Sequence, residues 1–186
     1  MSDKTDEEII ALYKSGNEEV FKDLIEKYSS PIYNFTAHII GKDNATDIVQ
    51  ETFIKVWKNI NRFNSSKSSF KTWIFTIAKN TITDFLRKKK HLNFSDIEND
   101  NDDFSFSESI EDEKILPDEA IQKMQDSEFL NKLLDKLSLQ YKTILILHYQ
   151  EEMTFDEIGK ILNKPLNTVK SYHRRAILEL RNMIIM

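Results

Sequence analysis

The sequence predicts an all-α protein in which two small helical domains are joined by an acidic linker. The 186 residues include only 3 Gly and 3 Pro, the residues that most often interrupt helices, and 31% of the residues are charged. Apolar residues recur at helical spacing in both halves of the chain. The stretch between the halves is acidic and has no sustained apolar period. We therefore expect an N-terminal domain over 1–90, a linker over 91–125 and a C-terminal domain over 126–186.

The formal net charge of −5 conceals an uneven distribution along the chain. Residues 1–90 carry 15 basic and 12 acidic side chains, and residues 126–186 carry 9 and 8. Residues 91–125 carry only 2 basic but 11 acidic side chains. The acidity thus lies in the predicted linker, and both domains remain suited to a polyanion such as nucleic acid. A fully hydrated linker does not need the apolar residues scattered through it, so we expect part of it to dock on a surface.

The first two helices are marked by their end signals. Thr5 and Glu8 form the pattern of a capping box ahead of an apolar run. Gly16 predicts a stop, and Asn17 predicts a new N-cap. The apolar residues that follow keep helical spacing, although Pro31 predicts a kink or a break just before it.

The third helix is expected to run from about Asn44 to Ile60. Its apolar face includes Phe53, Val56 and Trp57, which we expect mainly in the core. Its opposite face is polar and includes Asp47, Gln50, Glu51, Lys55 and Lys58.

The fourth helix, over 70–90, follows a polar loop over 61–69. Its buried stripe consists of Phe70, Trp73, Ile74, Ile77, Ala78, Thr81 and Phe85. Its exposed face is expected to carry Thr72, Phe75, Thr76, Asn80 and Thr83, with the basic residues Lys71, Lys79, Arg87, Lys88, Lys89 and Lys90 beside them. Basic groups, amides and hydroxyls next to an aromatic ring suit a partly unstacked strand of nucleic acid. The alternatives are a hydrated helix end for the lysines and packing between helices for Phe75.

The C-terminal domain contains a helix-turn-helix pattern. Thr154 and Glu157 form a second capping box, Asn163 suits a left-handed helix end, and Pro165 can open a new helix. The second helix places Leu166, Val169, Ala176 and Leu180 on its inward side. Its opposite face carries Asn167, Lys170, Ser171, Arg174 and Arg175. A recognition helix requires such short polar side chains and Arg for base edges, with Lys for phosphates. A hydrated amphipathic helix with a basic face is the simpler alternative.

Several classes of function lack the residues they need. The chain has no Cys, which excludes disulfides and thiolate metal sites. Asp47 and Glu51 could supply half of a metal site, but no His or further carboxylate is placed to complete it. Without a phosphate-binding Gly loop or a Ser/His/Asp pattern, we expect no enzymatic activity and no cofactor. The N-terminus lacks a signal pattern, and no apolar stretch approaches the roughly 20 residues that span a bilayer, which predicts a cytoplasmic protein without membrane insertion.

Three motifs resemble those of extracytoplasmic-function (ECF) sigma factors, members of the sigma-70 family. The segment Asp47–Trp57 resembles their second conserved region, and Phe70–Asn80 looks like the adjoining region that melts and reads the −10 element. Glu157–Gly159, followed by Thr168–Ser171 and Arg175–Ala176, is similar to their fourth region, which reads the −35 element. The resemblance covers both domains and leaves only the linker unmatched.

This resemblance implies a sigma factor that binds core RNA polymerase and directs promoter-specific transcription initiation. Asp47, Gln50 and Glu51 would dock on the clamp helices of the polymerase large subunit, and the flap would be a second contact. The −10 element would be read by Ser65, Lys71, Lys79, Asn80, Asp84, Arg87 and Lys88. The −35 element would be read in the major groove by Asn167, Thr168, Lys170, Ser171, Arg174 and Arg175. An anti-sigma factor that holds the domains together is a further expected partner.

Some positions depart from the family's pattern. Asn167 stands where Gly is frequent, Tyr172 where Arg is common, and Asn163 replaces a frequent Gly. Asn167 and Tyr172 are expected on or beside the reading surface, so the −35 sequence does not follow from the resemblance.

The linker has a length that suits two separated promoter elements. Elements some 17 base pairs apart lie about 58 Å apart along B-DNA. The residues 91–125 have a root-mean-square span of roughly 30–35 Å and a maximum of about 115 Å. Both domains can therefore bind at once, while the linker's negative charge predicts weak DNA binding by the free chain.

Two other functions compete with this one. A stand-alone helix-turn-helix regulator would use residues 1–90 for dimerisation or ligand sensing and would bind a symmetric operator tightly without polymerase. An all-helical adaptor would bind only proteins, and it leaves the basic face around Lys170 and Arg175 unexplained.

Overall fold

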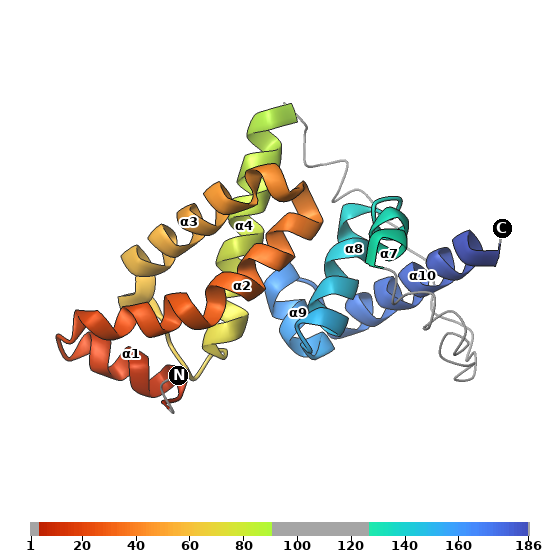
Figure 1. Ribbon diagram of the computed structural model, residues 1–186. Helices are drawn as coiled ribbons and strands as arrows, with labels where there is room; N and C mark the ends of the chain where they lie inside the picture. The colour runs from red at the N-terminus through yellow and green to blue at the C-terminus, as the bar shows by residue number, and fades with distance from the viewer. Residues whose placement is uncertain (1–3, 91–126, 186) are drawn as a thin grey trace.

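The computed structural model describes residues 4–90 and 127–185, and every regular element in these two ranges is a helix. The predicted linker lies outside the described residues. Figure 1 shows two helical bodies side by side, with α2 and α4 of the first next to α8 and α9 of the second. We call them the N-terminal module and the C-terminal module. The predicted all-α class is confirmed.

The N-terminal module contains four α-helices and two short 3₁₀ turns. They are α1 (Asp6–Lys14), η1 (Glu18–Val20), α2 (Phe21–Ile40), α3 (Lys42–Asn59), η2 (Ile60–Arg62) and α4 (Phe70–Lys90). Helix α2 packs against both α3 and α4, which also contact each other. Aromatic rings fill the end of this core, where Phe70 lies 5.4 Å from Tyr28 and 5.5 Å from Phe63 between ring centroids.

The helix ends follow the sequence signals at most positions. The capping box of α1 is confirmed: the backbone N–H of Thr5 donates to Glu8 Oε2 at 2.8 Å, and the N–H of Glu8 donates to Thr5 Oγ1 at 3.3 Å. Gly16 adopts φ +104°, which ends the first helix without the strain an L side chain would suffer. Asn17 takes the predicted N-cap position, but the element that it opens is the short turn η1, and its side chain makes no capping hydrogen bond.

Pro31 does not break α2, which runs without interruption from Phe21 to Ile40. A proline inside a helix removes one backbone hydrogen bond and costs about 3 kcal/mol. The neighbouring residues Tyr28, Ile32 and Phe35 are all buried in the module core. Burying each such side chain contributes about 1.5–3 kcal/mol, so packing outweighs the cost of the proline.

Helix α3 buries a narrower face than its sequence indicates. Phe53 and Val56 lie in the core as expected, together with Ile48. Trp57 does not, because 52% of it is exposed. The buried face centres on Val56, and the next residue along a helix is turned away from it by about 100°. The expectation of a core Trp57 is therefore wrong.

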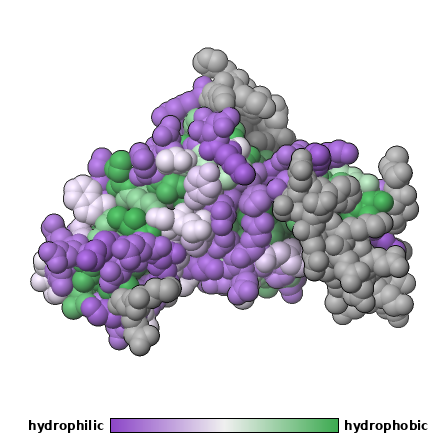
Figure 2. Space-filling view, viewed as in Figure 1, coloured by the Kyte–Doolittle hydropathy of each residue, from purple (hydrophilic) through white to green (hydrophobic). Residues whose placement is uncertain are grey.

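The C-terminal module consists of α7 (Ser127–Leu134), α8 (Leu139–Leu145), the π-helical turn η3 (Ile146–Gln150), α9 (Phe155–Leu162) and α10 (Leu166–Ile185). A small apolar cluster joins α7, α8 and α10 through Leu133, Leu134, Leu137, Leu145, Ala176 and Leu180. The larger apolar cluster of the molecule contains buried residues of both modules. Figure 2 shows a mostly hydrophilic outer face with separate hydrophobic spots on the N-terminal module.

Among the described residues, we find no helix with the length and apolar character needed to cross a membrane.

Candidate nucleic-acid interface

The turn between α9 and α10 is built by two residues with special backbone roles. Asn163 adopts the left-handed conformation, with φ 53° and ψ 46°, as its place in the sequence predicts. The N–H of Lys164 then donates to the carbonyl of Gly159 at 2.9 Å. A Cβ atom on Gly159 would lie 2.8 Å from the backbone oxygen of Lys164, so only glycine fits there. Gly159 belongs to a motif of the sequence, but its close approach to the turn does not follow from the sequence pattern.

The start of α9 is fixed by the second predicted capping box. The N–H of Thr154 donates to Glu157 Oε2 at 2.9 Å, and the N–H of Glu157 donates to Thr154 Oγ1 at 3.3 Å. Together with the turn, this places α9 and α10 as a helix-turn-helix. The predicted motif is confirmed.

The N-terminal half of α10 gathers the six predicted −35 residues on its outer side. Asn167, Lys170 and Arg174 are exposed. The flanks of this face are formed by the half-buried residues Thr168, Ser171 and Arg175. Val169 and Ala176 are fully buried on the opposite side, as expected. The helix therefore presents amide, hydroxyl and basic groups together, which is the chemistry needed to contact bases and phosphates.

Two residues of α10 lie differently from their predicted positions. Leu166, the first residue of α10, was expected to face inward but is 41% exposed, so that expectation is wrong. Tyr172 was expected on or beside the reading surface but is only 7% exposed. Its ring packs against Tyr141 of α8 at 5.9 Å, so it holds α10 in place and does not face a ligand.

An aromatic cluster that was not predicted from the sequence packs between η3, α9 and α10. His173 of α10 lies 3.0 Å from the Tyr149 hydroxyl, measured from its Nε2 atom. The His148 ring stacks on Phe155 at 4.4 Å and meets His173 edge to face at 5.2 Å. Burial, with the nearby His148 as a second cause, lowers the pKa of His173 to about 4. The cluster joins η3, α9 and α10. Its residues lie too far apart in the sequence for helical spacing to predict their contact.

The predicted −10 residues are spread along the preceding loop and the whole length of α4. Ser65 is exposed in the loop, and Asn80, Arg87 and Lys88 are exposed on the helix. Asp84 accepts a hydrogen bond from Arg87 at 3.0 Å and lies 3.7 Å from the ammonium of Lys55 on α3. This half of the helix presents a mixed, mainly basic surface.

The other half of the expected α4 face is covered. Thr72 is 2% exposed, and Phe75 is fully buried with its ring 5.4 Å from Phe35. The expected exposure of both residues is wrong, and the alternative of helix packing for Phe75 is confirmed. Helix α9 lies against α4. Because the two helices are at least 65 positions apart in the sequence, no local pattern predicts this contact.

Helix α3 carries the predicted polymerase-facing residues on its outer surface. Asp47 and Gln50 are exposed, and Glu51 pairs with Lys55 at 2.9 Å. The ammonium of Lys55 also donates to Thr81 Oγ1 at 3.1 Å, which ties α3 to α4. Within the described residues, no three His, Cys, Asp or Glu side chains are grouped so that they could hold a metal ion.

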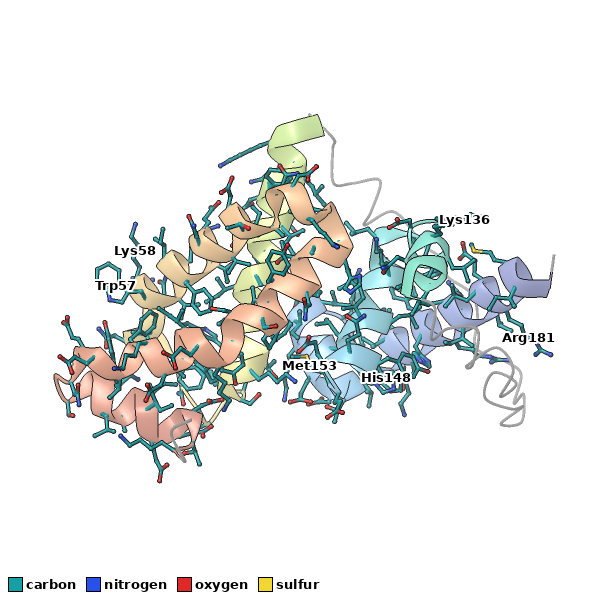
Figure 3. The ribbon with its side chains drawn as sticks, viewed as in Figure 1. Trp57, Lys58, Lys136, His148, Met153 and Arg181 are labelled. Atoms are coloured by element: carbon teal, nitrogen blue, oxygen red, sulfur yellow. The ribbon has the colours of Figure 1, made fainter. Side chains whose placement is uncertain are left out.

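An apolar patch extends this outer surface of α3. Ile54 is 51% exposed, and Trp57 points away from the helix bundle next to Lys58 (Figure 3). Large apolar side chains exposed beside carboxylates and amides are typical of a protein-binding surface. The polar half of this surface was predicted from the sequence, whereas the exposed Ile54 and Trp57 were not.

The two modules meet through polar contacts between α4 and the segment that begins the helix-turn-helix. Lys71 donates to the backbone oxygen of Glu151, and the carboxylate of Glu151 lies 3.7 Å from the same ammonium. Thr72 Oγ1 donates to Glu157 Oε1 at 3.4 Å. Met153, which is 2% exposed, lies between the modules (Figure 3).

The carboxylates at this junction have shifted pKa values. Burial raises the pKa of Glu151, and the adjacent Lys71 opposes that rise. Burial acts in the same direction on Glu157, but hydrogen bonds from Thr154 and Thr72 outweigh it and leave the pKa of Glu157 lowered. The charged form of each carboxylate is stabilised by hydrogen-bond donors. One of these donors belongs to the N-terminal module in each case: Lys71 for Glu151 and Thr72 for Glu157.

Comparison with known proteins adds evidence that the geometry alone does not give. A family model described as Sigma-70 region 2 matches residues 24–92, and one described as Sigma-70, region 4 matches residues 130–180. The chain is 32% identical over 173 residues to the ECF RNA polymerase sigma factor SigW of Bacillus subtilis, covering 92% of each protein. It is 24% identical to the ECF RNA polymerase sigma-E factor of Haemophilus influenzae, covering 97% of this chain and 95% of that one.

Solved structures share the fold at lower sequence identity. CnrH in complex with the cytosolic domain of CnrY superposes with a TM-score of 0.69 at 19% identity, covering 97% of each chain. The sigma factor RpoE of Bartonella quintana, solved with the anti-sigma factor NepR, gives a TM-score of 0.65 at 23% identity, covering 89% of this chain and 97% of that one.

The helix-turn-helix and the paired helical modules define a two-module transcription factor. Its relatives make that class specific: the chain belongs to the ECF sigma factors of the sigma-70 family.

Proposed function

We propose that this sigma factor directs core RNA polymerase to promoters through three surfaces: α3 for polymerase, the 61–69 loop with α4 for the −10 element, and α10 for the −35 element. The observation that carries the proposal is the N-terminal half of α10, where amide, hydroxyl and basic side chains face outward from a helix-turn-helix. As a member of its family the chain is a transcription initiation factor, and we propose that it has no enzymatic activity of its own.

Helix α3 is the proposed contact for the polymerase clamp helices. Asp47, Gln50 and Glu51 supply polar contacts, and the exposed Ile54 and Trp57 supply apolar area. Binding energy at protein interfaces concentrates on a few aromatic anchors surrounded by polar residues. Trp57 is the residue on this surface that best fits the role of an anchor.

Helix α4 and the loop before it are proposed to hold the melted −10 strand. Extruding a base from a duplex costs a few kcal/mol, which stacking and phosphate contacts must offset. Exposed Asn80 can bond to a base edge, while Arg87 and Lys88 can neutralise phosphates. Ser65, Lys71, Lys79 and Asp84 complete the proposed set.

Helix α10 is proposed to enter the major groove at the −35 element. Arg174 and Lys170 are exposed there and can reach base edges and phosphates, and Asn167 lies at the helix start. The half-buried Thr168, Ser171 and Arg175 flank them. Tyr172 is excluded from this set by its burial against α8.

The domain division, the cellular location and two further partners are part of the same proposal. We propose the division into 1–90, an acidic linker over 91–125 and 126–186, a cytoplasmic location and a second polymerase contact at the flap. An anti-sigma factor is a proposed partner, supported by the solved complex of a sigma factor of similar fold with the anti-sigma factor NepR.

Competition for core polymerase tests the α3 surface directly. Gln50→Ala and Trp57→Ala should each weaken core binding by about tenfold or more, because tenfold corresponds to only 1.4 kcal/mol. Glu26→Ala, an exposed change on α2, is the matched control and should compete like the wild type. Unchanged binding of both α3 variants would remove this surface from the polymerase contact.

A further inference from the structure

The 61–69 loop is fixed at both of its ends, although its middle is exposed. Phe63, near the start of the loop, is 6% exposed, and Phe70, where α4 begins, is fully buried. Their rings meet edge to face at 5.5 Å between centroids, so the two ends of the loop lie next to each other. The residues between them, 64–67, are all exposed. A loop whose ends are packed together in this way can present its exposed residues in a defined arrangement.

Hydrogen bonds within the loop order this exposed part. The side-chain oxygen of Asn64 accepts from the backbone N–H of Ser66 at 2.9 Å and from its hydroxyl at 2.8 Å. The N–H of Lys67 donates to the backbone oxygen of Asn64 at 3.1 Å. An asparagine that bonds the backbone two residues later is typical of a tight turn. Ser65, one of the proposed −10 contacts, therefore lies within an ordered turn.

Helix α1 contacts the same loop from a distant part of the sequence. The Lys14 ammonium, in the last turn of α1, donates a hydrogen bond to the backbone oxygen of Phe63 at 3.0 Å, across 49 positions. A charged donor makes a stronger hydrogen bond than a neutral one. Because the acceptor belongs to the backbone, this bond fixes the path of the chain where it enters the loop.

Helix α1 is itself attached to the core of the N-terminal module. In its first turn, Asp6 accepts a hydrogen bond from the Tyr28 hydroxyl of α2. The Tyr28 ring packs edge to face on Phe70, at the other end of the loop, with 5.4 Å between ring centroids. Ile9 and Ile10, in the middle of α1, are buried. Helix α1 thus has a fixed position against α2, from which its last turn reaches the loop.

We propose that Lys14 is a positioning residue for −10 recognition: it holds the 61–69 loop in the conformation that reads the −10 strand and does not touch the DNA. The inference rests on the proposed function of the loop. Its physical basis is preorganisation, since a loop already held in its bound conformation loses less conformational entropy on binding. Helix α1 would in this way contribute to promoter recognition without being part of the DNA-contacting surface.

Spin labelling of the loop tests the positioning without DNA. The chain has no native cysteine, so a nitroxide at Lys67→Cys, an exposed loop position, reports on the loop alone. In the full chain, Lys14→Met removes the donor but keeps the apolar stem, and the label should become more mobile. Lys14→Arg keeps a charged donor and should retain the wild-type line shape. Lys22→Met, which removes the same charge at an exposed position on α2, is the matched control and should also retain it.

Binding of a forked promoter DNA by the complex with core polymerase tests the consequence for recognition. The DNA is duplex over a −35 sequence chosen by selection and single-stranded over the −10 element, in which each base is replaced in turn. Lys14→Met should lower the preference for the selected −10 bases by about fivefold, the factor expected from one lost hydrogen bond. Lys14→Arg and Lys22→Met should keep the wild-type preference. The salt dependence of binding should be the same for all of these proteins, because none loses a phosphate contact.

The possible outcomes separate the role of Lys14 from the proposed function of the loop. An equal loss for every −10 sequence, with a salt slope reduced by about 1, would show that Lys14 binds a phosphate and would overturn the positioning. An unchanged label mobility in Lys14→Met, or an unchanged −10 preference while the wild type discriminates among the bases, would overturn it as well. A wild-type complex without any −10 preference would contradict the proposed function of the loop and with it the role of Lys14 in recognition. In that case the spin label would still show whether Lys14 holds the loop.

Discussion

A Cβ atom at Gly159 would lie 2.8 Å from the backbone oxygen of Lys164. That distance is shorter than real Cβ contacts, and the atom it meets belongs to the turn of the helix-turn-helix rather than to a flexible side chain. The position of α10 relative to α9 therefore depends on the absence of a side chain at residue 159.

Gly159→Ala should destabilise the C-terminal module by about 1–3 kcal/mol, the usual cost of forcing an extra carbon into a packed site. Thermal unfolding followed by circular dichroism measures the loss. Lys160→Ala, the exposed neighbour on α9, should change the unfolding temperature little. Equal stability of Gly159→Ala and the wild type would show that the turn can move.

The left-handed backbone at Asn163 predicts opposite results for two small substitutions. Asn163→Gly should leave stability nearly unchanged, since glycine has no steric penalty at φ 53°. Asn163→Ala should cost about 1 kcal/mol, because a Cβ atom without a compensating polar group is disfavoured in this region. Chemical denaturation of the two variants gives the difference in their free energies of unfolding. An alanine variant more stable than the glycine variant would contradict a left-handed backbone at residue 163.

Pro31 predicts a stabilising substitution in α2. Pro31→Ala restores a backbone hydrogen bond within an unbroken helix and should raise stability by about 1–3 kcal/mol. Ser30→Ala, at the exposed preceding position, is the control and should have a smaller effect. The comparison uses the denaturation midpoint, and a destabilised Pro31→Ala variant would mean that α2 requires the proline.

His173 predicts a loss of stability in mild acid. Its pKa is lowered from 6.5 to about 4 by burial and by the neighbouring His148, so the folded module favours the neutral ring. The corresponding stability is fully present above pH 6.5 and is lost as the pH falls toward 4.

The phenylalanine variant isolates this contribution. His173→Phe keeps an aromatic ring beside Phe155 but cannot take up a proton. Between pH 7 and pH 4.5 it should lose less stability than the wild type in thermal unfolding. Parallel pH profiles for the two proteins would assign the acid sensitivity to other groups.

Arg174 and Arg181 provide a matched pair on α10. Both are exposed, but Arg174 lies on the proposed reading face, while Arg181 lies toward the C-terminal end of the helix (Figure 3). In complex with core polymerase, Arg174→Ala should weaken promoter binding by about 1–3 kcal/mol, the value of one good base contact. Arg181→Ala should bind like the wild type, and equal losses from both variants would indicate only a general charge effect.

Local signals predicted the helices, both capping boxes and the helix-turn-helix, because each depends on residues a few positions apart. Gly16 and Asn163 ended helices as expected for the same reason. The errors occurred where distant segments meet. Thr72 and Phe75 look like an exposed face in the α4 pattern, yet burial of that face depends on Phe35 and on α9.

The candidate surfaces were predicted in unequal measure. The α10 face follows from helical spacing alone, apart from Tyr172, whose partner Tyr141 lies on another helix. Trp57 was wrongly predicted in the core, because a wide apolar stripe on α3 does not show which of its edges the neighbouring helices cover. The contact between Lys71 and Glu151 spans 80 positions, and its discovery required the packing of the two modules.

Run-off transcription with purified core polymerase tests the central claim most directly. With a promoter chosen by selection from random −35 and −10 sequences, the wild-type chain should yield a discrete transcript, and core polymerase alone should yield none. Trp57→Ala and Arg174→Ala should reduce that transcript, while Glu26→Ala and Arg181→Ala should not. The account is contradicted if the chain gives no promoter-specific transcript, or if the free chain binds a symmetric duplex site tightly and specifically without polymerase.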